Sequence, residues 1–256
     1  MSKEKAIFAV DIGNTVVHCG VFYGIRILKN FSFPSSNKTL SFYVRSLRNC
    51  IRKYRIVCSD VDRVVLCSVV PMLTPIVRDA LKRFLKTNIL IVGRDVDVPL
   101  KNNYKKPNQL GMDRLLAAFA ACKLYGPGVI IVDFGTAVTF DVVNKKGEFA
   151  GGMIFPGLDL SLDALHHHTA LLPAIDITNP QSLLGRDTVA CINSGIVFGM
   201  AGVCDGIIVR LKKRFKNYNV VATGGNIPLI KRYSSEIKIV RPALVLEGLN
   251  FLINSK

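Results

Sequence analysis

Short apolar runs that end in a turn recur along this chain and predict buried strands. Residues 6–10 form one such run, which stops at Asp11-Ile12-Gly13-Asn14-Thr15, and a second run covers residues 16–22. Apolar runs of this length, bounded by turn residues, are typical of buried strands. Because the Gly13-Asn14 pair favours a tight turn, the two runs predict a β-hairpin.

The same pattern returns in the second half of the chain. Residues 129–132 are apolar, Asp133-Phe134-Gly135-Thr136 reads as a turn, and residues 138–143 are apolar again. An internal repeat of this kind can decide the whole fold, and here it predicts a duplicated α/β architecture. We expect an N-terminal lobe at residues 1–105 and a C-terminal lobe at residues 106–256, with a cleft between them.

The remaining periodicity predicts mostly helices. They are expected at about residues 40–55, 112–124, 158–168, 186–216, 226–233 and 243–254, with another after Pro71 and Pro75, and strands at 63–69, 89–92 and 219–222. Residues 101–109 are polar and predict a loop. The glycines of Gly151-Gly152-Met153-Ile154-Phe155-Pro156-Gly157 permit unusual backbone angles, so we expect a loop that lines a site or packs the lobes together.

Composition indicates a globular protein in a reducing compartment. The chain has 256 residues, of which 50% are hydrophobic and 20% charged. No apolar run approaches the roughly 20 residues that cross a bilayer, and the first apolar run stops at Asp11, so neither a membrane span nor a signal peptide is expected. The seven cysteines are odd in number and contain no CxxC pair, which favours free thiols. We therefore expect a soluble, cytoplasmic protein.

The formal net charge of +16 raises the possibility of a nucleic-acid partner. The charge, however, follows helical spacing. Arg45, Arg48, Arg52 and Arg55 lie opposite an apolar stripe, and a second basic cluster closes the helix expected at residues 186–216. Both clusters are typical of solvated helix faces, so the pattern argues against nucleic acid as the main partner.

The two Asp-Gly turns are the first candidates for chemistry. Turn amides around a small glycine can face an anion, and an aspartate there can hold a hydrated Mg²⁺. One such turn is common in hairpins, but two copies, at Asp11 and Asp133, make a plausible clamp for a triphosphate. Neither GxxxxGK[ST] nor GxGxxG occurs. The glycine pair of Thr223-Gly224-Gly225-Asn226 could let an adenine or ribose lie on the backbone, or be an ordinary turn.

Gly111-Met112-Asp113-Arg114 lies where a polar segment enters a predicted helix. An aspartate in the first turn is commonly a capping residue. The functional alternative makes Asp113 the group that orients a substrate hydroxyl and accepts its proton, since phosphoryl transfer depends mainly on positioning and charge neutralisation. His166, His167 and His168 lack the spacing of a known metal motif and point in different directions on a helix.

Taken in order, these motifs resemble those of type III pantothenate kinases, members of the actin, sugar-kinase and heat-shock-chaperone ATPase superfamily. The similar segments are DIGNT at 11–15, NYKKPNQLGMDR at 103–114, DFGTAVTFD at 133–141, GGMIFPGL at 151–158, TALLP at 169–173, LGRDT at 184–188, SGIVFGM at 194–200, TGG at 223–225 and LEGL at 246–249. The resemblance implies a two-lobed, ribonuclease H-like (actin-like) fold. It also implies ATP-dependent phosphorylation of pantothenate to 4′-phosphopantothenate, the first step of coenzyme A biosynthesis.

The resemblance further implies roles for individual residues. ATP would be bound by Asp11, Ile12, Gly13, Asn14, Thr15, Val16, Val17, His18 and Thr136. Pantothenate would be bound by Tyr104, Gly111, Met112, Asp113, Arg114 and Thr188, the last from across a homodimer interface. Asp113 would be the catalytic proton acceptor, Asp11 would hold the Mg²⁺ of the nucleotide, and Asp133 would hold a monovalent cation, K⁺ or NH₄⁺.

Two other functions stay open at this point. One is a catalytically inactive regulatory or transcription accessory protein of the same fold, against which the intact Asp11, Asp113, Asp133 and Thr136 argue. The other is a kinase for another small metabolite. The segment between Tyr104 and Arg114 argues against this alternative, because the segment resembles a pantothenate site.

Overall fold

The structure, a computed structural model, describes residues 5–254, which form two compact units. Unit 1 consists of the described part of Met1–Leu100, Lys105–Ala120 and Leu244–Lys256, and unit 2 of Lys101–Tyr104 and Ala121–Ala243. The units are interleaved along the chain, whereas the expected lobes, residues 1–105 and 106–256, are each continuous. That division stays a prediction.

Each unit contains one sheet, and the two sheets have equivalent strand orders. Unit 1 has the order β3 (Arg26–Pro34), β2 (Val16–Tyr23), β1 (Ala6–Ile12), β4 (Val61–Ser68), β5 (Ile89–Ile91). Unit 2 has the order β9 (Glu148–Pro156), β8 (Ala137–Val143), β7 (Val129–Phe134), β10 (Asn219–Thr223), β11 (Ile239–Val240), with β6 (Lys101–Asn102) added beside β9. In both sheets the central strand pairs antiparallel with the next strand and parallel with a later one. The predicted hairpins and the duplicated α/β fold class are confirmed.

The helices lie close to the predicted positions. They are α1 (Leu40–Tyr54), α2 (Thr74–Lys82), α3 (Met112–Tyr125), α4 (Leu158–His167), α5 (Thr188–Arg214), α6 (Ile227–Ile230) and α7 (Leu244–Asn254), with short 3₁₀ turns at Cys58–Asp60 and Pro107–Gln109. The four arginines predicted on the outer face of α1 are exposed, while Tyr43 and Leu47 on its inner face are buried.

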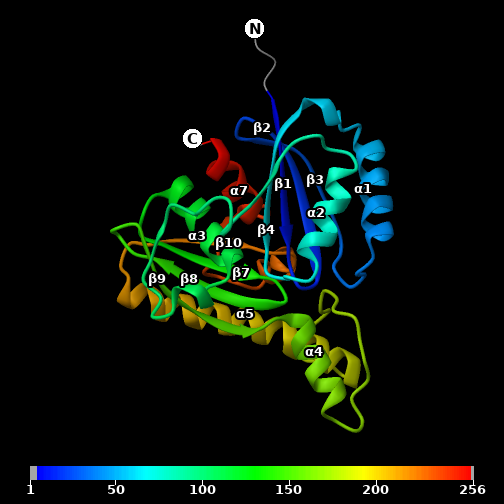
Figure 1. The fold of residues 1–256 in the computed structure, drawn as a ribbon. Coiled ribbons are helices and arrows are strands. Elements are labelled where there is room, and N and C mark those ends of the chain that lie inside the picture. The colour runs from blue at the N-terminus through cyan, green and yellow to red at the C-terminus, as the bar shows by residue number, and fades with distance from the viewer. Residues whose placement is uncertain (1–4, 255–256) are drawn as a thin grey trace. The chain divides into compact units, whose positions relative to one another are not determined.

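Helices cover both faces of the unit 1 sheet. Figure 1 shows α1 and α2 side by side on one face. There the alternate residues Phe8, Val10 and Ile12 of β1 share a buried cluster with side chains of α1 and α2. The other face carries α7, because a Cβ at Gly20 of β2 would lie 3.2 Å from Leu246 Cδ1. Side chains of β1 that point away from the α1/α2 core therefore point towards α7.

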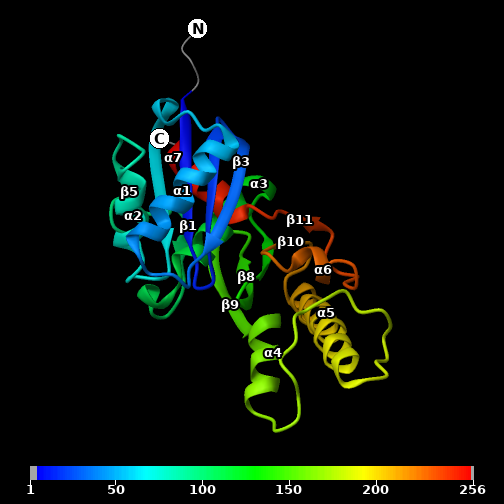
Figure 2. The same ribbon diagram turned by 90° about the vertical axis from the view of Figure 1, so that its right-hand side faces the viewer.

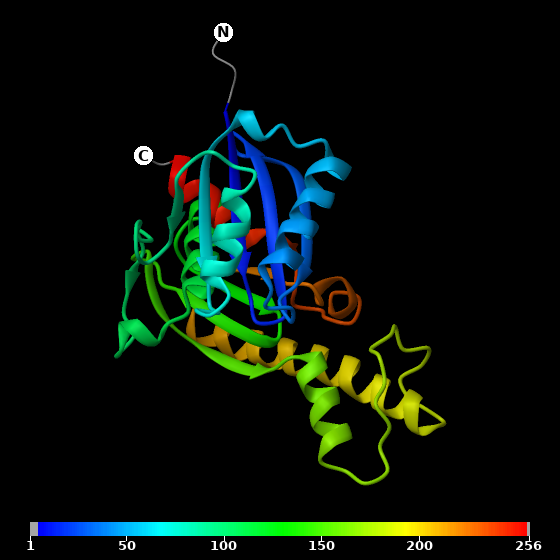
Figure 3. The same ribbon diagram turned by 45° about the vertical axis from the view of Figure 1, so that its right-hand side comes forward.

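The unit 2 sheet packs on the long helix α5. Alternate apolar residues of β7 and β8 share a buried cluster with Val197, Met200, Cys204 and Ile208 of α5. Figures 2 and 3 show α4 following β9 directly and lying beside α5, with the segment between α4 and α5 forming a long connection. Residues 168–187 contain no helix or strand.

Three expectations about local structure were wrong. The glycine-containing segment expected as a loop at residues 151–157 forms most of β9, since pairing with β8 satisfies its backbone and Gly151 takes a φ of +133° where the register shifts. β3 was missed because it is a partly exposed edge strand with little apolar periodicity. The polar segment 101–109 contains β6, which pairs with β9.

One helix among the described residues, α5, is long and apolar enough to cross a bilayer by length and composition. This corrects the statement that no apolar run approaches that length, because small and apolar residues in α5 together outnumber its few charges. Nearly half of the apolar window is buried inside the structure, and the core helices of water-soluble proteins pass the same test.

Candidate active site

The first Asp-Gly turn joins β1 to β2 and is held by backbone hydrogen bonds. The Gly13 amide donates to Val16 O (3.0 Å), the Ser35 hydroxyl donates to Gly13 O (2.7 Å) and the Ser35 amide donates to Thr15 O (2.9 Å). A Cβ at Gly13 would lie 3.1 Å from Val16 O, so this position favours glycine. The exposed Asn14 is thus presented on a rigid turn.

Of the nine residues predicted for ATP, the eight consecutive ones at 11–18 do not all offer their side chains. Ile12 and Val17 are buried in the core on the α1/α2 side, so only their backbone can meet a ligand. Asp11 and His18 are cross-strand partners on the opposite face, the one that carries α7. Burial lowers the pKa of His18, so its imidazole is neutral at physiological pH and adds no positive charge beside Asp11.

Asp113 lies in the first turn of α3, in the same unit as Asp11. Its Oδ1 accepts a hydrogen bond from the Arg114 amide (2.8 Å). A side chain at position 111 would collide with this oxygen, so the glycine at Gly111 allows the carboxylate to fold back over the start of the helix. Met112 points away and packs against Gly93, whose φ is +79°.

Electrostatics place Asp11 and Asp113 near one another. Burial raises the pKa of the Cys67 thiol well above its usual range, and the charges of Asp11 and Asp113 raise it further. Cys67 is the β4 partner of Asp11, so both carboxylates lie near one thiol on the α7 face of the sheet. The structure therefore brings together two acidic residues that are far apart in the sequence.

Burial also raises the pKa of Asp113 above its ordinary value. The hydrogen bond from the Arg114 amide and the charge of Arg114 act in the opposite direction but do not cancel the effect of burial. A carboxylate with a raised pKa is a better proton acceptor, since the acid it forms is weaker.

The second Asp-Gly turn, in unit 2, is enclosed by glycine backbones. Gly224, with a φ of +100°, lies so close that a Cβ there would be 2.5 Å from Phe134 O and 2.6 Å from Asp133 Oδ1. Both oxygens therefore lie against Gly224, and only a glycine fits there. A side chain at Gly157 would collide with Thr136 O, and the Gly157 amide donates to that oxygen (3.2 Å).

Tyr104 is presented by a strand that the sequence did not predict. The Tyr104 amide donates to Asn102 Oδ1 (2.9 Å), and its ring packs edge-on against Phe149 with centroids 5.8 Å apart. Glu148 fixes this strand by accepting hydrogen bonds from Lys101 Nζ (2.6 Å) and Asn103 Nδ2 (2.9 Å).

Glu148 is a functional candidate that sequence reasoning missed. Asn144 Nδ2 also donates to it (2.9 Å), and its donors, with Lys101 first, lower the pKa of Glu148 to about 2. The carboxylate thus stays charged at any physiological pH. No local motif indicates it, because two of its three partners, Lys101 and Asn103, are 47 and 45 residues away in the sequence.

Thr188 is the exposed first residue of α5, in unit 2. The side chain of the preceding Asp187 caps the helix by accepting from the Ala190 amide (2.8 Å). The described hydrogen bonds do not connect Thr188 with any other candidate residue of this chain.

The histidines of α4 are engaged locally. His166 Nδ1 lies 3.0 Å from Leu172 O, and His167 Nδ1 lies 2.9 Å from Asp163 O. Within residues 5–254, no group of three or more His, Cys, Asp or Glu side chains is arranged to hold a metal.

The model of the type III pantothenate kinase family matches residues 7–210. A relative described as a type III pantothenate kinase, from Sulfurihydrogenibium sp., is 36% identical over 96% of this chain and 98% of the relative. Another with the same description, from Dehalococcoides mccartyi, is 37% identical over 98% of each chain.

Solved structures share the fold at low sequence identity. The ethanolamine utilization protein EutJ from Carboxydothermus hydrogenoformans has a TM-score of 0.58 at 17% identity, covering 98% of this chain and 91% of EutJ. The activator of 2-hydroxyisocaproyl-CoA dehydratase from Clostridium difficile, with bound ADPNP, has a TM-score of 0.53 at 14% identity, covering 98% and 95%. These likenesses show the actin-like fold alone.

The raised pKa of Asp113 predicts that this residue lowers stability at neutral pH. In the folded chain its ionised form is penalised by burial, whereas in the unfolded chain it is not. The Asp113→Asn variant should therefore melt at a higher temperature than the original chain at pH 7. The difference should shrink as the pH falls through the raised pKa towards 3.8, because the buried acid then becomes neutral.

Thermal unfolding followed by circular dichroism between pH 4 and pH 8 measures this difference. Asp163→Asn, at an exposed position on α4, is the matched control and should leave the melting temperature nearly unchanged. An Asp113→Asn variant that melts at or below the original temperature at pH 7 would contradict the dominance of burial.

Proposed function

The chain belongs to the type III pantothenate kinase family, and from that premise we propose how its residues transfer the γ-phosphate of ATP to pantothenate. Asp113 accepts the proton of the primary hydroxyl of pantothenate as that oxygen attacks the phosphate. The observation that carries this assignment is the buried Asp113 carboxylate with a raised pKa, in the same unit as Asp11 and acting on the same thiol, Cys67.

The geometry around Asp113 fits a proton acceptor better than a simple cap. A cap stabilises a helix without needing burial, yet burial is the largest influence on the Asp113 pKa. The adjacent Arg114 offers positive charge towards the carboxylate of pantothenate. Since the attacking hydroxyl need lose its proton only late in a loose transition state, a modest base is sufficient.

The turn at Asp11 is the proposed phosphate site. Its amides can face the phosphates, because Gly13 brings no side chain and Ser35 fixes the loop by bonding its carbonyls. Mg²⁺ prefers one or two carboxylates together with phosphate oxygens, and the neighbouring Asp11 and Asp113 fit that preference. When bound, the metal would neutralise phosphate charge, with Asp11 as the proposed ligand. Thr136 is a further proposed contact of ATP.

Asp133 is the proposed ligand of a monovalent cation. Potassium and ammonium ions are held by several oxygen atoms, and Asp133 Oδ1 and Phe134 O both lie close to Gly224. The carboxylate supplies charge and the carbonyl supplies a neutral oxygen. A cation here would offset the negative charge of a bound triphosphate.

Two features support a homodimer. Of the fourteen large hydrophobic residues that are exposed within residues 5–254, nine lie between residues 153 and 209, all in unit 2. On α5, space remains open above Gly195, Gly199 and Gly202, which would let another helix approach closely. Exposed apolar surface of this extent marks interaction sites. A dimer would also explain why Thr188 is exposed, since it would reach the pantothenate of the partner subunit.

The proposed location is the cytoplasm. All seven cysteines are free, and Cys19, Cys67 and Cys204 are buried as small apolar residues. Free thiols of this kind suit a reducing compartment.

A coupled ADP-release assay tests the reaction. With Mg·ATP and K⁺, ADP release should depend on pantothenate, and Asp113→Asn should lower turnover by about 100-fold or more, as for loss of a general base. Asp163→Asn should keep full turnover. ADP release that does not depend on pantothenate would contradict pantothenate as the substrate. Near-normal turnover in Asp113→Asn would contradict the role of Asp113 as proton acceptor.

Glu148→Gln tests the presentation of Tyr104. The substitution removes the charge that holds Lys101 and Asn103, so the KM for pantothenate should rise on the order of tenfold while kcat changes little. The control is Glu236→Gln, which removes a single ion pair with Lys212 (2.6 Å) elsewhere in unit 2. If both parameters stay unchanged, Glu148 does not position the substrate strand. If kcat falls by about as large a factor as KM rises, Glu148 has a general structural role.

Light scattering during size-exclusion chromatography tests the dimer. The mass that light scattering gives for the original chain should be twice the monomer mass. Ile154→Asp should shift it towards monomer and lower activity, because Ile154 is 66% exposed in the apolar region. Ile25→Asp, on unit 1 and 79% exposed, is the matched control and should change neither. A monomeric, fully active original chain would contradict the proposal.

A further inference from the structure

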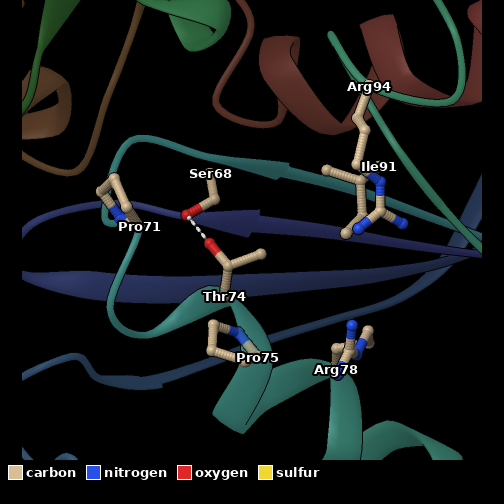
Figure 4. Close-up of a pocket in the computed structure, with 7 residues that line it drawn as sticks. All are labelled: Ser68, Pro71, Thr74, Pro75, Arg78, Ile91 and Arg94. Carbon is tan, nitrogen blue, oxygen red and sulfur yellow. Dashed lines mark hydrogen bonds between the residues drawn. The ribbon is translucent and has the colours of Figure 1, made fainter.

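A pocket of about 380 Å³ lies in unit 1, on the face of the sheet opposite to Asp11. Ser68 ends β4 and points towards α2, where the Thr74 hydroxyl donates to the Ser68 hydroxyl (2.8 Å; Figure 4). The preceding residue, Cys67, points to the other face, beside the two carboxylates. Because successive side chains of a strand point to opposite faces, this pocket is separate from the proposed catalytic residues.

Two arginines flank the pocket, which we call the Arg78–Arg94 pocket. Arg78 lies on α2, and Arg94 follows β5. Figure 4 shows Arg78 on α2 and Arg94 across the pocket from it, with Ile91 overlapping the guanidinium of Arg94 in this view and with Pro71 and Pro75 further along the pocket. One end of the pocket therefore carries two arginines, each paired with a carboxylate, and the rest of its wall is largely apolar.

Each guanidinium is oriented by the acidic residue that follows it. Arg78 Nε lies 3.0 Å and Nη2 2.9 Å from Asp79 Oδ1. Arg94 Nε and Nη2 bond the two oxygens of Asp95 at 3.0 and 2.8 Å, and Asp95 also accepts from the Ile91 amide (2.9 Å). Both arginines thus use Nε and Nη2 on a carboxylate, and neither Nη1 makes a hydrogen bond within residues 5–254.

Paired guanidinium groups around a gap have a clear physical use. Each guanidinium is already paired with a carboxylate, so an anion that enters the pocket gains the charge-assisted hydrogen bonds that the two remaining Nη1 groups can donate. A planar carboxylate is well satisfied by a single guanidinium fork. A phosphate presents three oxygens in different directions, so it can bridge two guanidinium groups on opposite sides.

We propose that the Arg78–Arg94 pocket binds a small phosphate monoester. The phosphate lies between the Nη1 groups of Arg78 and Arg94, and the apolar substituent of the ester rests on Pro71, Pro75 and Ile91. The volume is at the lower end of the roughly 300–1,000 Å³ found for small-molecule sites, which fits a substituent about the size of one ring. The site is additional to the phosphate-binding turn at Asp11 and does not depend on the proposed reaction.

Isothermal titration calorimetry with phenyl phosphate tests the proposal on the full chain. The titration is carried out with saturating non-hydrolysable ATP analogue and pantothenate, so that other phosphate-binding positions are filled. The original chain should bind one equivalent. Arg78→Gln/Arg94→Gln should bind at least about tenfold more weakly, because two charge-assisted bonds are lost. Benzoate, which carries a planar carboxylate, should bind more weakly than phenyl phosphate.

The matched control is Arg45→Gln/Arg48→Gln, which removes two exposed arginines from α1 and should bind like the original chain. Circular dichroism verifies that each double variant is folded. Equal binding by a folded Arg78→Gln/Arg94→Gln variant would overturn the proposal, as would the absence of millimolar binding by the original chain. If the Arg78/Arg94 variant loses the ligand but keeps pantothenate-dependent ADP release, the pocket and the reaction are separate.

Discussion

The structure depends on the pairing of one central strand in each sheet. β1 and β7 each pair antiparallel with the following strand and parallel with a later one, and each carries an aspartate one residue before its end. Because side chains alternate along a strand, the residues next to that aspartate enter the core while the aspartate points to the other face. The same pairing therefore buries Ile12 and presents Asp11.

Close packing of glycine backbones fixes the elements that strand pairing brings together. Gly224 and Gly157 lie against the turn at Asp133 with no room for a Cβ, and Gly248 of α7 lies so near α3 that a Cβ would be 2.6 Å from Leu116 O. Side chains at these positions would push the elements apart. In unit 2 the turn at Asp133, and in unit 1 the helix α3 that carries Asp113, are thus held in place by glycine backbone that packs directly against them.

Burial of charge links function with stability. Burial raises the pKa of Asp113, which would make it a better proton acceptor in the proposed reaction, and for the same reason its ionised form costs folding free energy. Glu148 is the opposite case. Its hydrogen-bond donors lower its pKa, so its charge contributes to holding the strand before Tyr104. One carboxylate is suited to change its protonation state, and the other is suited to keep it.

Local sequence determined the parts of this protein in which near neighbours make the structure. The apolar runs and Asp-Gly turns predicted both hairpins, and the order of the motifs identified the family. Tertiary structure decided the rest. β9 has the glycines of a loop and becomes a strand only because β8 pairs with it, and Asp11 and Asp113, far apart in the sequence, both raise the pKa of Cys67 in a third segment. Arg78 and Arg94 form a pocket because α2 packs beside β5. Periodicity and turn propensity report on neighbours within a few residues, whereas pairing, burial and converging charge are set by residues that only the folded chain brings together.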